Sequence, residues 1–465
     1  MQNTYLFYDI ETSGLNKCFD QVLQFAAIRT DLELNELERH EVLIKLNPDT
    51  IPSPQAILVH QLTLEQLKTG ICEYEAMREI HQLFNTPGTT TIGYNTLGFD
   101  DEFLRFSFYR NLLPPYTHQY ANGCSRMDLY PMTVMYYLFK PEDIVWPKIA
   151  EKNTLKLEHL SAHNELANGK AHDAMTDVEA ALALARLLRK KGEMWEYLCG
   201  CFDKKVDLER LAKLPFSFRV YRQALIVDGG FGVDKFYQCP VIGLGMHNHY
   251  KNQSLWLQLD SPRLADTTAA SIPETTFVYR KRFGEQPLLL PLTKRFDKYL
   301  SDERRKLIID NIGWLQKNTH IFQDVVRYHQ EYKYPEVPNL DADAALYQNG
   351  FLKDVEQLMC SRFHAVDLRE KIDLIKRFTN PSLRIQAIRV LGRNYPEALS
   401  DDLRKEFDEY LDKIRSSEVV VDYRNEAHLT PEAVLAEIKQ LQQAGNLSVV
   451  QLSLLQELAK YIQFL

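Results

Sequence analysis

The segment from Leu6 to Gly14, LFYDIETSG, constrains the fold of this chain more than any other. An apolar run leads into it and Thr12-Ser13-Gly14 ends it, so the pattern predicts a buried strand that stops at a turn. Side chains alternate faces along a strand, and Asp9 and Glu11 therefore point the same way. Two carboxylates placed together at the end of a core strand favour a cation-binding site.

Three regions of different character follow one another along the 465 residues. Strand-like and helix-like runs alternate up to about residue 195, which is typical of an α/β domain. Short runs rich in Val, Ile, Tyr and Phe, followed by helical stretches, then predict a small antiparallel barrel or sandwich with a helical extension. The last part is helical in pattern. We therefore expect three domains, over residues 1–195, 196–340 and 341–465.

The elements of the first domain follow from hydrophobic periodicity. The expected strands are 5–10, 24–31, 41–46 and 91–94. The expected helices are 74–84, 103–109 and 173–189.

Charge and cysteine usage narrow the possible functions. The formal net charge of −8 argues against a uniformly basic nucleic-acid binder, so any nucleic-acid contact must be a local groove. The seven cysteines are scattered without a CxxC pair, which is typical of a reducing cytosol and disfavours a zinc site. The sequence shows neither a secretory leader nor an apolar stretch of membrane-spanning length. We expect a soluble cytoplasmic protein with no membrane contact.

Two further segments contain residues that could join Asp9 and Glu11 in one site. GYNTLGFDDEFL places Asp100 at the start of a helix, and AHDAMTDVEA contains His172 and Asp177. Five positions rotate a helix by about 140°, so His172 is expected in the loop before the helix that carries Asp177. Two charges about 4 Å apart repel by about 4 kcal/mol at an effective dielectric of ~20, so a cluster of four carboxylates needs cations or protons. Oxygen ligands favour Mg²⁺ or Mn²⁺, and a histidine can accept a proton near neutral pH.

The motifs YDIETSG, GYNTLGFDDE and AHDAMTD resemble those of the DEDDh exonuclease family. The resemblance implies an RNase H-like core and two Mg²⁺ ions, with Mn²⁺ as a substitute. It implies Asp9, Glu11, Asp100 and Asp177 as metal ligands, with His172 and Glu11 as catalytic residues and His172 as the general base. The family pattern puts the third ligand directly after Phe99, which favours Asp100 over Asp101.

Further segments are similar to the bacterial exonuclease I family: QFAAIRTD, FDDEFLRFSFYRN, KPEDIVWP, LKLEHL, ALYQNGF and RNYP. The similarity is dense in the first domain and sparse in the last. It implies a Src-homology-3-like β-barrel in the middle and an all-α C-terminal domain that closes over the substrate. It also implies degradation of single-stranded DNA from the 3′ end, with release of 5′-mononucleotides, in DNA repair and recombination. We expect a monomer.

The chain departs from this family pattern at two places. The resemblance would put part of a docking surface for the single-stranded DNA-binding protein near 288–327, where the sequence diverges. Lys156 stands where the family pattern has a phosphate-binding arginine, and it keeps the charge but loses the bidentate fork.

Cations and aromatic rings alternate between Arg105 and Arg126, as in proteins that bind single strands. Arg105 and Arg126 would meet phosphates, whereas Tyr116 and Tyr120 would either stack on bases or pack within the protein. Together with Glu11 and Lys156, these four residues are the candidates for substrate binding.

Two alternatives remain open from the residues themselves. The same acids and histidine would serve RNA equally well, so a 3′ to 5′ exoribonuclease is the rival enzyme. A non-catalytic single-strand binding protein is the rival of another class. The complete set of acids counts against it, because a binder gains nothing from a metal cluster that it must desolvate.

Overall fold

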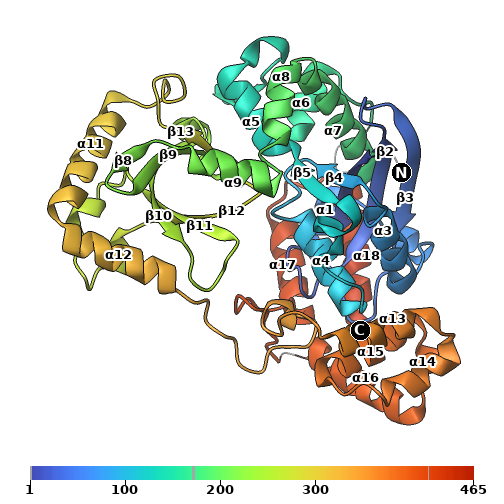
Figure 1. Cartoon of the computed structure of the whole chain (residues 1–465). Helices are drawn as coiled ribbons and strands as arrows, with labels where there is room; N and C mark the ends of the chain where they lie inside the picture. The colour runs from blue at the N-terminus through green and yellow to red at the C-terminus, as the bar shows by residue number, and fades with distance from the viewer. Residues whose placement is uncertain (1–2, 170–172, 417) are drawn as a thin grey trace.

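The computed structural model describes residues 3–169, 173–416 and 418–465, which form three regions (Figure 1). The N-terminal region, which we call the exonuclease region after the family that its motifs resemble, is built on a five-stranded mixed sheet between layers of helices. The middle region is a six-stranded antiparallel sheet with helices beside it, and the C-terminal region is helical. The fold class expected from the sequence is confirmed, while the domain boundaries stay predictions.

The exonuclease region contains two sheets and nine α-helices within the described residues. Its strands are β1 (Thr4–Thr12), β2 (Val22–Thr30), β3 (Glu36–Leu43), β4 (Thr89–Gly93), β5 (Ser125–Asp128) and the small pair β6 (Lys148–Ile149) and β7 (Lys152–Asn153). The helices, including two that lead to the middle region, are α1 (Pro54–His60), α2 (Leu64–Lys68), α3 (Glu73–Phe84), α4 (Asp100–Arg110), α5 (Leu129–Phe139), α6 (Leu157–Asn164), α7 (Ala174–Arg189), α8 (Gly192–Cys199) and α9 (Lys204–Ala212).

The other two regions complete the chain. The middle region contains β8 (Phe216–Phe218), β9 (Tyr221–Val227), β10 (Gln238–Met246), β11 (Gln253–Gln258), β12 (Val278–Arg282), β13 (Leu288–Pro291), α10 (Ile272–Thr275), α11 (Asp302–Lys317) and α12 (Thr319–Glu331). The C-terminal region contains α13 (Asp354–Ala365), α14 (Leu368–Ile375), α15 (Pro381–Asn394), α16 (Asp401–Arg415), α17 (Pro431–Gln443) and α18 (Val449–Gln463).

Strand β1 lies at the centre of the first sheet, whose order is β3-β2-β1-β4-β5. It pairs antiparallel with β2 and parallel with β4. One face of β1 presents Leu6, Tyr8 and Ile10 to a core formed with α3 and α4. The opposite face presents Phe7 to the core that contains α5 and α7. Asp9 and Glu11 share this second face because side chains alternate along a strand.

The third strand differs from the prediction. The sequence predicted a strand over 41–46, and β3 instead begins at Glu36 and ends at Leu43. Because β3 is an edge strand with exposed, charged residues along most of its length, it lacks the apolar run by which a core strand is recognised.

The contacts between the C-terminal region and the exonuclease region include an apolar cluster and buried ion pairs. Helices α17 and α18 pack against α1, and Ile51 and Ile57 lie in one apolar cluster with residues of both helices. Arg393 of α15 contributes a buried ion pair, in which its Nη2 lies 2.6 Å from Asp49 Oδ2 and 2.5 Å from Asp343 Oδ2. None of the described helices is both long and apolar enough to cross a membrane.

Candidate metal centre

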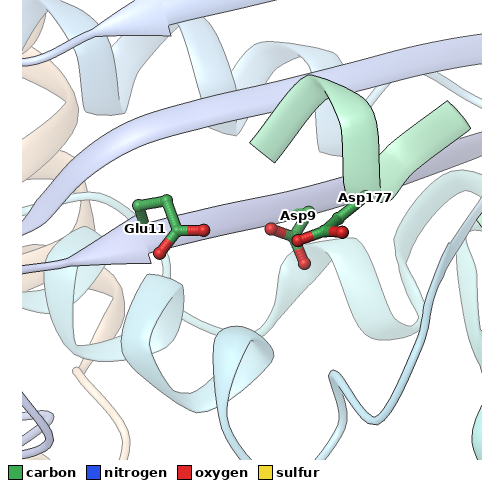
Figure 2. Close-up of side chains that lie close together, drawn as sticks. All are labelled: Asp9, Glu11 and Asp177. Carbon is green, nitrogen blue, oxygen red and sulfur yellow. The ribbon is translucent and has the colours of Figure 1, made fainter. Parts of the chain in front are cut away.

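Three carboxylates converge at the end of β1. Asp9 and Glu11 come from the strand itself, and Asp177 comes from the first turns of α7, which covers the same face. Each residue offers an oxygen, and the three oxygens lie within 4.8 Å of one another. Figure 2 shows the Asp177 carboxylate beside that of Asp9, with Glu11 further along the strand. The gathering of these three acids agrees with the sequence prediction.

The start of α7 is fixed by Asp173 and by Gln24 of β2. The Asp173 carboxylate caps the helix by accepting the Thr176 N–H at 3.3 Å. Gln24, which pairs with Glu11 in the sheet, donates its Nε2 to Asp173 Oδ1 at 3.2 Å and accepts the Ala174 N–H at 3.4 Å. The strand beside β1 therefore sets the position of the helix that carries Asp177.

Asp100 and Asp101 have different environments at the start of α4. Asp101 is fully buried, and it accepts bonds from Arg105 Nη2 at 2.7 Å, Arg126 Nη1 at 2.5 Å and His118 Nε2 at 3.0 Å. These partners occupy both of its oxygens. Asp100 lies outside the 4.8 Å cluster, and its charge contributes to the raised pKa of Asp9. This arrangement favours Asp100 over Asp101 as a further ligand.

Electrostatics make the cluster suitable for a cation. Burial, followed by the charge of Asp177, raises the pKa of Glu11 to about 8. Burial also raises the pKa of Asp100 to about 8, and the pKa of Asp9 is raised well above its usual range by burial and by the charges of Asp100 and Glu11. Oxygen ligands with mutual repulsion of this kind are neutralised by a hard divalent cation. The donor set therefore fits Mg²⁺ or Mn²⁺.

The loop before α4 is held by Asp128, a residue that the sequence analysis did not identify as part of the site. Its carboxylate accepts N–H bonds from Asn95 at 2.8 Å, Leu97 at 3.1 Å and Tyr130 at 2.9 Å. Asn95 has a left-handed backbone with φ of 65°, as expected of a residue in the turn before α4. The position of Asp128 before the apolar helix α5 is the capping signal that could have identified it.

Apart from Glu11, which lies in the acid cluster, the predicted substrate-binding residues fall into two groups. Lys156 and Tyr120 have exposed side chains, and Lys156 Nζ lies 3.6 Å from Glu158 Oε1. Arg105 and Arg126 are buried, and both are ion-paired with Asp101. Tyr116 packs under Arg105, whose guanidinium carbon lies 5.3 Å from the ring centre. Contact of these residues with DNA stays a prediction.

His172, the predicted general base, lies outside the described residues. Residue 173, which follows it, is the N-cap of α7. The role of His172 therefore stays a prediction from the sequence.

Several known proteins are similar to this chain in both sequence and fold. Residues 6–185 match the exonuclease family RNase_T, and residues 340–465 match the exonuclease I C-terminal domain. Exodeoxyribonuclease I of Escherichia coli is 28% identical over 92% of this chain and 93% of the relative. The structure of E. coli exonuclease I in complex with a dA16 oligonucleotide has a TM-score of 0.87 and 26% identity, over 100% of both chains. The zinc-ion-bound form of the E. coli enzyme with single-stranded DNA has a TM-score of 0.84 and 26% identity, over 100% of this chain and 99% of that chain.

The mixed sheet, the acids converging from β1 and α7, and the matched exonuclease domain define a nuclease that hydrolyses phosphodiester bonds. The chain belongs to the exodeoxyribonuclease I family.

Proposed function

We propose that this protein is a divalent-metal-dependent exonuclease that degrades single-stranded DNA from the 3′ end and releases 5′-mononucleotides. The observation that carries the proposal is the cluster of Asp9, Glu11 and Asp177, whose oxygens lie within 4.8 Å. Single-stranded DNA is supported as the substrate by the E. coli relative, which was solved with a dA16 oligonucleotide.

Asp9, Glu11 and Asp177, together with Asp100, would hold two Mg²⁺ ions. Such ions lower the pKa of a water molecule and stabilise charge on both the attacking and the leaving oxygen. Mn²⁺ would substitute, because it takes the same oxygen ligands.

The protein's own groups would then position and deprotonate the nucleophile. His172 would accept the proton of the attacking water, as its place in AHDAMTD implies, because its ordinary pKa lies near neutral pH. Gln24 and Asp173 would keep Asp177 in register with β1 through the bonds that fix the start of α7.

We also propose a cytoplasmic monomer that cooperates with a single-stranded DNA-binding protein. The proposal is supported by Lys298, within residues 288–327, whose Nζ lies 5.7 Å from the ring centre of Phe139 and 4.7 Å from that of Tyr299. Lys298→Glu should weaken binding of that partner in a titration, while cleavage of a bare oligonucleotide stays unchanged.

The function is tested by incubating matched 5′-labelled single-stranded DNA, duplex DNA and RNA with the protein, in Mg²⁺ and in EDTA. A shortening ladder on single-stranded DNA that disappears in EDTA supports the proposal. Shortening of RNA alone would instead identify an exoribonuclease. Binding of the single strand without cleavage in Mg²⁺ would identify a non-catalytic binding protein.

A further inference from the structure

The first turn of α4, residues 100–102, is a point where all three regions meet. Asp101, fully buried in this turn, accepts bonds from His118, Arg105 and Arg126. Arg105 also reaches the C-terminal region, because its Nη1 donates to the hydroxyl of Tyr347 at 2.8 Å. The residue that precedes Asp101 is the proposed metal ligand Asp100.

Arg126 extends this network into the middle region. Its Nη2 donates to Glu285 Oε1 at 2.7 Å, while its Nη1 donates to Asp101. Glu285 lies in the turn between β12 and β13, and its side chain is 18% exposed. Lys281 Nζ donates to the Glu285 backbone carbonyl, which fixes the turn. One guanidinium group thus joins a carboxylate of the middle region to a carboxylate next to Asp100.

The planar guanidinium makes this connection directional. Arg126 presents its donors in a rigid fork, so the bonds to Glu285 and to Asp101 are oriented together. If Glu285 lost its charge, Arg126 would keep its bond to Asp101 but would lose the charged partner that fixes the orientation of its guanidinium, so Asp101 would be held less precisely. Since Asp100 and Asp101 are consecutive in one helical turn, the backbone that carries Asp100 would be held less precisely as well. Misplacement of a reacting group by about 1 Å can reduce the rate by about 10²-fold.

We propose that Glu285 is a positioning residue for phosphodiester cleavage. Through Arg126 and Asp101, Glu285 fixes the turn of α4 that carries Asp100. The contact between the middle region and the exonuclease region therefore affects the rate of phosphodiester cleavage. The inference rests on the proposed exonuclease function and adds that a residue of the middle region, outside the acid cluster, controls its rate.

The test compares Glu285→Gln with wild type on a long single-stranded oligonucleotide and on the p-nitrophenyl ester of thymidine 5′-monophosphate. The ester lacks the further nucleotides through which a long strand could contact the middle region. We expect kcat to fall by about 10-fold or more on both substrates, with KM for the ester within about twofold of wild type. The Mg²⁺ concentration for half-maximal activity should rise.

The matched control is Glu331→Gln. Glu331 is a glutamate of the same region that bonds to Asn248 and, at 3.1 Å, to His249, both also in the middle region. This variant should leave both kcat values unchanged. A double-mutant cycle with Asp101→Asn should show that Glu285→Gln causes little further loss once Asp101 has lost its charge.

Three results would overturn the inference: an unchanged kcat on the ester, a loss confined to KM on the long strand, or a lowered melting temperature with unchanged kcat. If Asp101→Asn does not fold, the comparison of Glu285→Gln with Glu331→Gln on the ester still decides the matter. Failure of the proposed function is distinguishable, because wild type itself would then leave both substrates intact in Mg²⁺.

Discussion

Burial and mutual repulsion raise the pKa values of Asp9, Glu11 and Asp100 when no cation is bound. The raised pKa values of Glu11 and Asp100, each about 8, mean that both carboxyls are largely protonated at pH 7 in the metal-free protein. A cation binds the ionised form, so Mg²⁺ should displace protons, and its affinity should increase with pH up to about 8.

We therefore predict release of ~1 proton or more per protein on Mg²⁺ binding at pH 7. Calorimetric titrations in two buffers of different ionisation enthalpy measure this number directly. The release should decline above pH 9, where the carboxyls are already ionised, which provides an internal control. Equal heats in both buffers at pH 7 would contradict the prediction.

Asp177 offers the sharpest single substitution. Asp177→Ala removes one of the three converging carboxylates and should reduce kcat by roughly 10³-fold or more, the scale of losing direct transition-state stabilisation. Binding of single-stranded DNA, measured by fluorescence anisotropy in EDTA, should stay within a few-fold of wild type. Glu179→Ala is the control, because Glu179 lies on the same helix but pairs with Arg39 at the surface. Retained turnover in Asp177→Ala would refute the site.

At the scale of single residues, the sequence predicts the gathering of the acids better than it predicts the partners of the buried arginines. Asp9, Glu11 and Asp177 lie in local motifs that fix their direction, and the structure brings them together. Arg105 and Arg126 show the limit, because alternation of cations and rings also arises where a buried acid must be neutralised. Their common partner Asp101 is 25 residues from Arg126 in sequence, and no local sequence pattern predicts that pairing.

Among the elements, helix α5 and the loop before α4 depend on one side chain, Asp128. Asp128→Ala would leave a helix without its cap and two further N–H groups without their acceptor. We expect a loss of about 2–4 kcal/mol in the free energy of unfolding, measured by urea denaturation. Asp203→Ala removes the exposed cap of α9 and should cost about 1 kcal/mol. Equal losses in the two variants would show that the loop does not depend on Asp128.

Core elements could be predicted from periodicity, whereas edge elements could not. Strand β1 and helix α7 have strong apolar faces and appear close to where the pattern puts them. Strand β3 is defined by hydrogen bonds to β2 rather than by burial, and its charged sequence resembles a loop. Whether such a segment forms a strand depends on its pairing with a neighbouring strand, and a single sequence does not show that pairing.

Across the whole molecule, the buried pairs of Arg393 hold the C-terminal region to the exonuclease region. Although burial alone would raise the pKa of Asp343, the nearby guanidinium groups of Arg393 and Arg389 lower it to about 2. Arg393→Gln would leave Asp49 and Asp343 with too little positive charge, and should cost about 3–5 kcal/mol of stability.

Thermal and urea unfolding measure this loss of stability. Limited proteolysis should show earlier cleavage of the chain that leads into the C-terminal region. Arg384→Gln is the matched control, because Arg384 lies on the same helix but forms a surface pair with Glu406 at 2.7 Å. That variant should lose less than about 1 kcal/mol. Similar losses for both substitutions would contradict a special role for the buried pair.

The packing of α18 against the exonuclease region also affects the order of events during synthesis. The Glu65 N–H donates to Glu457 Oε1 at 3.2 Å, although the two residues are 392 positions apart in sequence. A ribosome that adds about 5–20 residues per second needs roughly 20–80 s to make the intervening chain. For nearly all of that time Ile51 and Ile57 lack α17 and α18, which cover them in the finished protein. The exonuclease region is thus synthesised first and completed last.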